Sequence, residues 1–225
     1  ISTVDDRIGR VLAKLDKLGL REDTIVVFMS DNGHSAEHNQ VRVDNHSSGF
    51  PKGYYYGANG GGGNTGKWRG HKGTFYEGGL RVPAIISFPR GLPRGEVRDQ
   101  AITAMDWYPT VLDLCGLDVP KGVKLDGRSV LPLIRDARAP TPYKMMHWQW
   151  ASKWAVREGD WKLIGINRKR KGKPDETQVS MTLVNLADAK PEEKNYTEQK
   201  IDIVHRLYAL HEAWAKEVTP AGKGG

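Results

Sequence analysis

The sequence predicts an α/β fold followed by a smaller α+β unit at the C-terminal end of the chain. Residues 25–29 and 84–88 are short, unbroken apolar runs, typical of strands buried on both faces of a parallel sheet. An amphipathic helical pattern precedes the first run, which gives a helix followed by a strand. Further strand patterns and a closing amphipathic helix indicate the second unit.

The composition is that of a globular protein. At 225 residues and 38% hydrophobic content, the chain can bury one large core or two small ones. No stretch approaches the roughly 18 apolar residues that cross a bilayer, and Ile1 starts no leader sequence, so we expect no membrane partner and a processed or truncated chain. The single Cys115 excludes an internal disulfide framework. The net charge of +7 favours an anionic partner: nucleic acid, anionic lipid, or an acidic glycan or small molecule.

Two helices are predicted in the first part of the chain. Over residues 3–18 the apolar side chains recur on one helical face, and Gly19 provides a C-terminal stop. A second helix is expected over residues 103–114, with Asp106 as its N-cap and Pro109 in its first turn. We expect the first helix, with the strand that follows it, to serve as scaffold.

Asp31, Asn32 and Gly33 directly follow the first strand. Ligands gather beyond the carboxyl ends of strands in open α/β sheets, so these side chains point at whatever the protein binds. A carboxylate next to a carboxamide offers the hard oxygen donors that Ca²⁺ and Mg²⁺ prefer. A plain turn uses the same residue types, and the two interpretations stay open at this point.

A long segment without periodicity, residues 34–66, follows this strand end. Loops of such length are usually functional, and we expect this one to line a substrate cleft. Tyr54, Tyr55 and Tyr56 supply rings that can pack on sugar faces, although they can equally pack on the domain or belong to a disordered insertion. The expected polar contacts come from His38, Asp44, Asn45 and His46.

Residues 67–83 combine aromatic side chains, glycines and the cations Arg69, Lys72 and Arg81. Glycines permit close backbone approach, and the cations favour an anion, so the segment reads as a rigid anion-handling loop. Nucleic acid could use the same ingredients. Arg81 is also placed to form a structural ion pair at the start of the next strand.

A Pro-containing polar link near residue 140 divides the chain into residues 1–140 and 141–225. The expected elements of the second part are a hairpin of strands at 154–157 and 161–166, a third strand at 182–186 and a helix over 201–214. The basic run at 168–173 lies between two strands, so a solvated hairpin loop explains it as well as a nucleic-acid or nuclear-signal motif does.

The chain resembles the C-terminal half of a type I sulfatase. The resemblance rests on Asp-Asn-Gly at residues 31–33 and on Gly-His-Lys-Gly-Thr-Phe-Tyr-Glu-Gly-Gly-Leu-Arg-Val-Pro at residues 70–83, in that order. Three further stretches, at residues 11–20, 105–114 and 125–131, support it. The resemblance implies an alkaline-phosphatase-like fold, in which helices flank a large mixed sheet and a smaller antiparallel sheet with a helix lies at the C-terminal end.

The resemblance also implies a set of functional residues. Asp31 and Asn32 match the family's pair of ligands for Ca²⁺, or alternatively Mg²⁺, and Lys72 matches the lysine that binds a sulfate oxygen. His34 is placed beside them as a catalytic residue, with His71, Arg69 and the three tyrosines as substrate contacts. The family's nucleophile is a formylglycine made from a Cys/Ser-x-Pro-x-Arg motif, which this sequence lacks. The implied function is hydrolysis of sulfate esters of a sulfated sugar or polysaccharide, or of a small molecule.

Several expectations follow from the half-site. The chain alone should be inactive, its first partner is the missing N-terminal half, and the family resemblance favours a periplasmic or extracellular enzyme over a nucleic-acid or membrane binder. One alternative is a phosphatase, phosphodiesterase or transferase of the alkaline phosphatase superfamily. The other is a non-catalytic module that binds sulfated glycans or nucleic acid through its basic surface.

Overall fold

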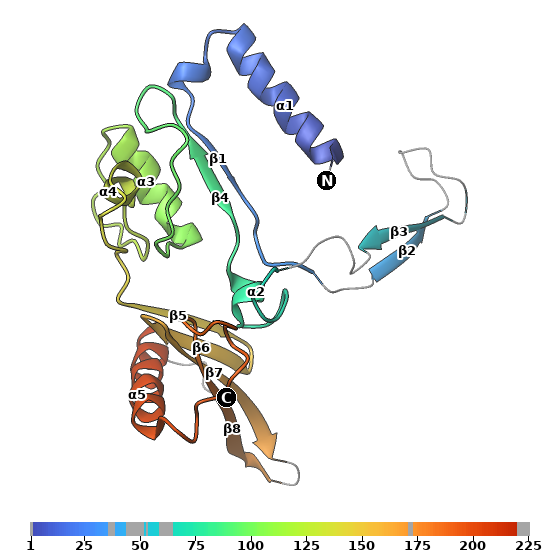
Figure 1. The fold of residues 1–225 in the computed structure, drawn as a ribbon, viewed down its shortest axis with the longest axis vertical. Coiled ribbons are helices and arrows are strands. Elements are labelled where there is room, and N and C mark those ends of the chain that lie inside the picture. The colour runs from blue at the N-terminus through green and yellow to red at the C-terminus, as the bar shows by residue number, and fades with distance from the viewer. Residues whose placement is uncertain are drawn as a thin grey trace. The chain divides into compact units, whose positions relative to one another are not determined.

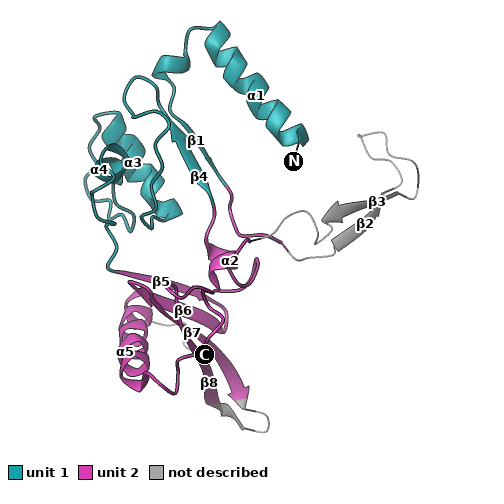
Figure 2. Cartoon of the chain, in the orientation of Figure 1, with its two compact units in different colours: residues 1–29, 83–144 teal, residues 30–82, 145–225 magenta. Residues whose placement is uncertain are grey.

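The computed structural model describes residues 2–35, 39–43, 52, 54–58, 65–170 and 173–219, with the backbone alone for 39–43, 54–58, 170 and 173–176 (Figure 1). The chain forms two compact units (Figure 2). Unit 1 comprises residues 1–29 and 83–144, and unit 2 comprises residues 30–82 and 145–225. The segment that carries the predicted site therefore belongs to the same unit as the C-terminal sheet.

Unit 1 begins with helix α1 (Ser2–Lys17), which confirms the amphipathic pattern. None of its residues is buried within the described structure. A short 3₁₀ turn, η1 (Arg21–Asp23), leads into strand β1 (Val26–Met29), and strand β4 (Ala84–Ser87) forms at the second apolar run. The two predicted strands are thus present, each within one residue of its expected bounds.

The parallel arrangement expected for β1 is wrong within the described residues, where β1 pairs with β4 in antiparallel register, from Val26 opposite Ser87 to Met29 opposite Ala84. An unbroken apolar run reports that a strand is covered on two faces, but it carries no signal for the direction of the neighbouring strand. Both strands keep apolar surface in this structure, since Phe28 is 47% and Ile85 61% exposed.

The rest of unit 1 is helical: η2 (Ala104–Asp106), α3 (Trp107–Leu114) and α4 (Leu131–Arg135). Asp106 does not cap α3 with its side chain, contrary to expectation. It is instead the third residue of a capping box, in which its Oδ2 accepts from the backbone N–H of Thr103 at 2.7 Å. Its Oδ1 accepts from Arg128 N–H and from the Tyr143 hydroxyl, so this fully buried carboxylate ties three segments together.

Unit 2 contains the hairpin β2 (Asn39–Val43) and β3 (Tyr54–Ala58), helix α2 (Glu77–Leu80) and a four-stranded antiparallel sheet. The strands of this sheet are β5 (Met145–Trp150), β6 (Lys153–Glu158), β7 (Trp161–Arg170) and β8 (Lys173–Asn185), in sequence order, and α5 (Ile201–Val218) follows. The predicted hairpin, third strand and final helix are confirmed. The β2–β3 hairpin lies inside the segment that lacked any predicted structure, because two strands of five residues each give too short a periodic signal.

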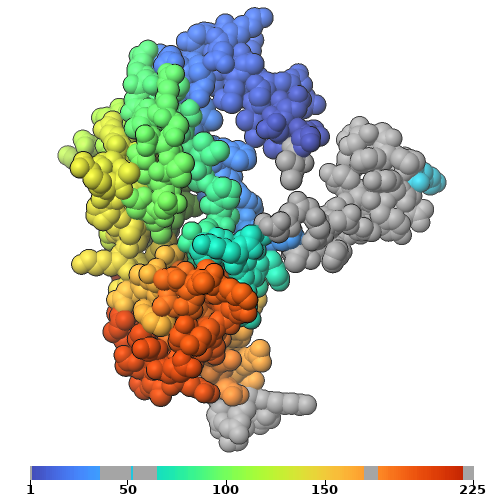
Figure 3. Space-filling view, viewed as in Figure 1, coloured from blue at the N-terminus to red at the C-terminus, as the bar shows by residue number. Residues whose placement is uncertain are grey.

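The four-stranded sheet is covered differently on its two faces. On one face Trp154, Val156, Leu163 and Leu183 form a buried core with α5, the red helix of Figure 1. Because side chains alternate along a strand, Lys153, Arg157 and Lys162 point to the opposite face. That face contacts the segment around α2, and in Figure 3 the teal atoms of this segment lie against atoms from the C-terminal part of unit 2.

We predict that Gly165→Ala destabilises the protein by about 1–3 kcal/mol, the usual cost of overpacking a core. A Cβ at Gly165 would lie 2.0 Å from Cε2 of Trp154, directly across the β6–β7 pair. Urea unfolding measures the change. The control is Gly9→Ala, because a Cβ at that helical position meets no atom within 4 Å. Equal stability changes for the two variants would contradict the packing argument.

Candidate active site

The strand-end residues Asp31, Asn32 and Gly33 form a bend fixed by its own polar groups. Ser30 Oγ donates to the carbonyl oxygen of Asn32 at 2.8 Å, and Asn32 Nδ2 donates to the carbonyl oxygen of Gly33 at 2.9 Å. With its nitrogen engaged, the Asn32 carboxamide presents its oxygen as the remaining donor atom for a cation. The side chain of Asp31 is exposed. The turn and site interpretations are therefore compatible, since these hydrogen bonds leave the Asp31 carboxylate exposed and the Asn32 carboxamide oxygen available.

Three glycines bring the two halves of the predicted site into backbone contact. A Cβ at Gly33 would lie 2.0 Å from the carbonyl oxygen of Gly78, and Gly33 N–H donates to Gly79 O at 3.2 Å. A Cβ at Gly78 would lie 2.6 Å from Arg69 O, and one at Gly79 would lie 2.5 Å from His71 O. Any larger residue would separate these segments, which explains why glycine is needed at all three positions.

Lys72 lies on the turn that this packing holds. Its backbone N–H donates to His34 O at 2.8 Å, so Lys72 and the strand-end residues occupy adjacent turns. The turn is closed by Thr74, whose Oγ1 accepts from His71 N–H at 3.1 Å and donates to His71 O at 2.7 Å. Gly73 has a φ of +83°, which favours glycine there. The structure thus brings Lys72 and the carbonyl of His34 together.

The predicted histidines contribute in different ways. His34 is half-buried and makes its contact to Lys72 through the main chain. His71 is exposed, and its Nδ1 lies 2.9 Å from the carbonyl oxygen of Lys72. That contact holds the ring against its own turn and leaves Nε2 as the atom available to a ligand.

Arg69 and Arg81 lie on either side of Lys72 in the sequence, and both make structural contacts. Arg69 Nη1 donates to Glu192 O at 3.1 Å, and its guanidinium lies 4.3 Å from the ring centre of Tyr76. Arg81 Nε donates to Glu77 Oε2 at 3.0 Å, as the predicted structural ion pair requires. Arg69 as a substrate contact stays a prediction, since its described partners are structural.

A buried ionic cluster, formed by Glu77, Lys162 and Glu192, fixes this loop to the C-terminal sheet. Lys162 Nζ lies 2.8 Å from Glu77 Oε1 and 3.0 Å from Glu192 Oε1, and all three residues are at most 3% exposed. Both carboxylate oxygens of Glu192 also accept from the backbone N–H of Glu77, at 3.0 and 2.9 Å. Every charge in the cluster is therefore paired, as burial demands.

Sequence reasoning missed Lys162 and Glu192 as parts of the site. Lys162 lies inside the apolar strand 161–166. Its charge is the one available signal for the cluster, because a lysine at a buried strand position needs an acidic partner. Glu192 has a φ of +64°, an uncommon conformation for a residue other than glycine, and it lies in a polar loop with no such signal. Their partner Glu77 is far away in the sequence.

The cluster shifts the ionisation of Glu77. Burial alone would raise the pKa of this carboxyl group, but the adjacent Lys162 charge and hydrogen bond, with Arg157 and Arg81, outweigh burial and lower the pKa below its ordinary value. Glu77 therefore remains a carboxylate at neutral pH.

The described residues fit part of a metal site. Asp31 and Asn32 supply two oxygen donors of the type that Ca²⁺ prefers, whereas that ion takes six to eight in all. Among the described residues, no three His, Cys, Asp or Glu side chains converge in the way a complete site requires. His38, Asp44, Asn45 and His46 lie outside the described residues, and the side chains of Tyr54, Tyr55 and Tyr56 are not described beyond their backbone in β3.

The sulfatase family profile matches residues 1–117, which is slightly more than half of the chain and includes the whole loop that carries Lys72. The chain belongs to the sulfatase family. A second profile, that of the C-terminal part of N-sulphoglucosamine sulphohydrolase, matches residues 66–173. The two matches meet on the segment that carries Lys72 and α2.

Individual relatives agree with the family assignment. Mouse (Mus musculus) steryl-sulfatase is 37% identical over 158 residues, which cover 70% of this chain and 23% of that protein. A solved protein from the metabolism of multiple glycosaminoglycans by Bacteroides thetaiotaomicron has a TM-score of 0.70 at 22% identity, covering 95% of this chain and 43% of that one. A protein solved with its substrate, D-glucosamine-2-N,6-O-disulfate, has a TM-score of 0.61 at 23% identity and covers 98% and 40%.

The fold is therefore the α/β, alkaline-phosphatase-like fold of sulfatases. The chain spans less than half the length of each of these proteins. Over the described part of the chain, no helix has the length and apolar character needed to cross a membrane.

We predict that Lys162→Met destabilises the protein by about 3–5 kcal/mol, because it leaves two buried carboxylates without their cation. Lys162→Arg should recover part of this loss, since the charge is retained. Chemical denaturation measures both. The control is Lys190→Met, which removes an ion pair between side chains that are 80% and 64% exposed, and such surface pairs contribute at most about 1 kcal/mol. Similar losses at positions 162 and 190 would contradict the role of the cluster.

We also predict an acid-dependent loss of stability that originates at Glu77. Because the folded-state pKa lies below the ordinary 4.5, the stabilisation is fully present above pH 4.5 and declines as the pH falls through the lower folded-state value. Unfolding free energies measured across this range should fall less steeply with acid in Glu77→Gln than in the parent. Parallel pH profiles for the two proteins would refute this assignment.

Proposed function

We propose that the whole protein is a sulfuric ester hydrolase and that this chain supplies the turns that carry Asp31, Asn32 and Lys72. The observation that carries the proposal is the backbone contact between those turns, Lys72 N–H to His34 O at 2.8 Å and Gly33 N–H to Gly79 O at 3.2 Å. In a chain of the sulfatase family, this contact supports a site in which the Lys72 cation and the two oxygen donors for a metal come from adjacent turns. That combination suits an anionic ester.

Each residue has a defined task in this proposal. Lys72 places its ammonium group on a sulfate oxygen and stabilises the charge that develops as the ester bond breaks. The Asp31 carboxylate and the Asn32 carboxamide oxygen would hold Ca²⁺, or alternatively Mg²⁺, which supplies further positive charge beside the sulfate. His34 and His71 contact the ester or its alcohol part. The formylglycine expected from the family would provide the nucleophile, and this chain lacks the motif from which it is made.

The proposed substrate is a sulfated sugar or polysaccharide. The support is a solved neighbour bound to a sulfated glucosamine and the matching profile of a sulphoglucosamine sulphohydrolase. Residues 34–66 leave and return beside the proposed sulfate pocket, so we assign them, with Tyr54, Tyr55 and Tyr56, to the wall of the substrate cleft. A periplasmic or extracellular location is consistent with such a polymeric substrate. Phosphate-ester chemistry and a purely binding role are not favoured by the family assignment.

We expect Asp31→Ala and Lys72→Ala to fail in different ways in the whole protein. Removing the Asp31 carboxylate takes a charged ligand from the metal, so Ca²⁺ affinity falls at least about tenfold and turnover of an aryl sulfate is lost. Removing the Lys72 ammonium leaves Ca²⁺ affinity in place and lowers kcat by about 10²–10³-fold. Calorimetric titration with Ca²⁺ separates the two variants without relying on activity.

The control for this pair is Asp118→Ala, which removes an exposed carboxylate in the loop after α3. It should leave both Ca²⁺ affinity and turnover unchanged. Near-parent activity in the Asp31 and Lys72 variants would show that the site is assigned wrongly. Loss of Ca²⁺ affinity in Lys72→Ala would show that this lysine supports the metal rather than the sulfate.

A further inference from the structure

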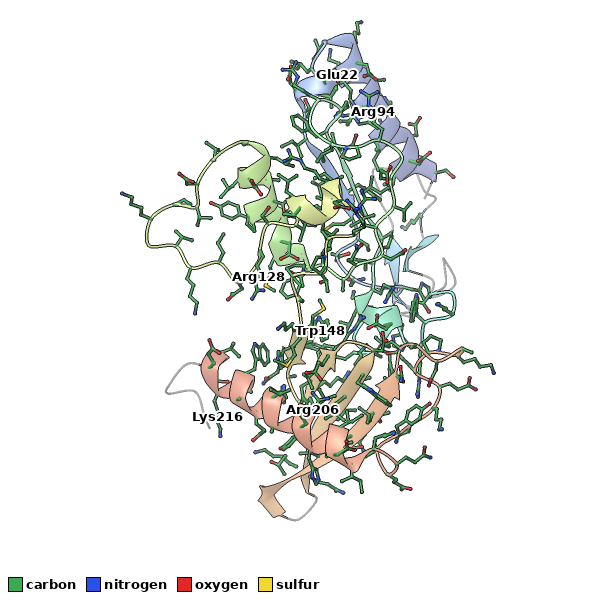
Figure 4. The ribbon with its side chains drawn as sticks, turned by 60° about the vertical axis from the view of Figure 1, so that its left-hand side comes forward. Glu22, Arg94, Arg128, Trp148, Arg206 and Lys216 are labelled. Carbon is green, nitrogen blue, oxygen red and sulfur yellow. The ribbon has the colours of Figure 1, made fainter. Side chains whose placement is uncertain are left out.

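Trp150 is a large apolar side chain left in the open, with 61% of its surface exposed. It ends β5, the edge strand of the four-stranded sheet, where the chain turns into β6. Trp148, labelled in Figure 4, precedes it by two residues on the same strand and is half-buried. A single exposed apolar residue is ordinary, so the meaning of Trp150 depends on what lies beside it.

Lys153 lies beside Trp150 and connects this indole to the turn that carries Lys72. Trp150 and Lys153 are opposite each other in the β5–β6 pair, and the Lys153 ammonium lies 5.4 Å from the centre of the indole ring. The same ammonium donates to the carbonyl oxygen of Gly73 at 2.8 Å. Gly73 directly follows Lys72, so one charged group separates the exposed indole from the turn that carries the sulfate-binding lysine.

The β5–β6 turn and the sheet behind it are held in place by further contacts. The β5–β6 turn is short, and Ala151 within it has a φ of +51°, so the turn is tightly bent. Lys162 and Arg157, on the same sheet face as Lys153, contact Glu77 of α2. The sheet that presents Trp150 is therefore fixed to the loop that presents Lys72 at two separate points.

We propose that Trp150 and Lys153 form a binding subsite for a sugar ring of an anionic glycan, next to the ring whose sulfate ester meets Lys72. This inference rests on the proposed function. An indole face packs well on the apolar C–H face of a pyranose. Lys153 uses one N–H on Gly73, and its ammonium retains two further donors for a sulfate or carboxylate on the same sugar. Flat apolar area with an adjacent cation suits a charged sugar unit.

The subsite can be tested in the whole protein with Trp150→Ala, Trp150→Phe and the control Tyr108→Ala. Tyr108 is an aromatic residue of unit 1 with similar exposure, 51%. The probes are a small aryl sulfate, a steryl sulfate, and hexasaccharides of heparan sulfate, chondroitin sulfate and carrageenan. Initial rates give kcat and KM for each probe, and thermal melting checks that the variants are folded.

The expected result is a change that depends on substrate size. For the hexasaccharide that the parent enzyme turns over fastest, Trp150→Ala should lower kcat/KM by about tenfold, mainly through KM. Trp150→Phe should retain most of the activity, because a flat ring remains. Hydrolysis of the aryl sulfate should change by less than about twofold, and Tyr108→Ala should match the parent on every probe.

Four outcomes would overturn the subsite. They are equal loss on the aryl sulfate and the hexasaccharide, no loss on either, selective loss on the steryl sulfate, and parent activity on the aryl sulfate without activity on any hexasaccharide. A parent protein that hydrolyses none of the sulfate esters would instead refute the proposed function itself. The failure of the inference is thus distinguishable from the failure of the function beneath it.

Discussion

The pairing of Glu77, Lys162 and Glu192 is the constraint on which the arrangement of unit 2 depends. Three charges at most 3% exposed are stable in the interior only while each has its partner. The carboxylate of Glu192 also accepts a hydrogen bond from the first backbone N–H of α2. The cluster therefore fixes the position of that helix as well as pairing the charge of its residue Glu77. Because α2 follows the Lys72 turn directly, the C-terminal sheet also supports that turn.

The sheet serves two partners through the alternation of its side chains. One face is apolar and packs on α5 through residues such as Trp154 and Leu163. The other face presents cations, of which Lys162 and Arg157 contact Glu77 and Lys153 contacts Gly73. The sheet therefore joins α5 to the segment that carries Lys72 within unit 2.

The predictable parts of the structure were those with a local signal. Helix α5 and the β6–β7 hairpin follow from periodicity and turn chemistry, and Asp31 with Lys72 stood out through the motifs around them. Partners distant in sequence were not accessible, because nothing near Glu192 indicates that it meets Glu77. The antiparallel β1–β4 pairing was missed for a similar reason: an apolar run records burial and omits strand direction.

The contacts that join the two turns of the proposed site are made by main-chain atoms. Gly33 meets Gly79, and His34 meets Lys72, through backbone N–H and C=O groups. The identity of the side chain at position 34 is thus uncoupled from this alignment, whereas the His71 ring contacts the carbonyl oxygen of Lys72. Under the proposed function, the side chain at position 34 can therefore change over evolution without disturbing the main-chain contacts that align the two turns, so one framework can come to accept different esters.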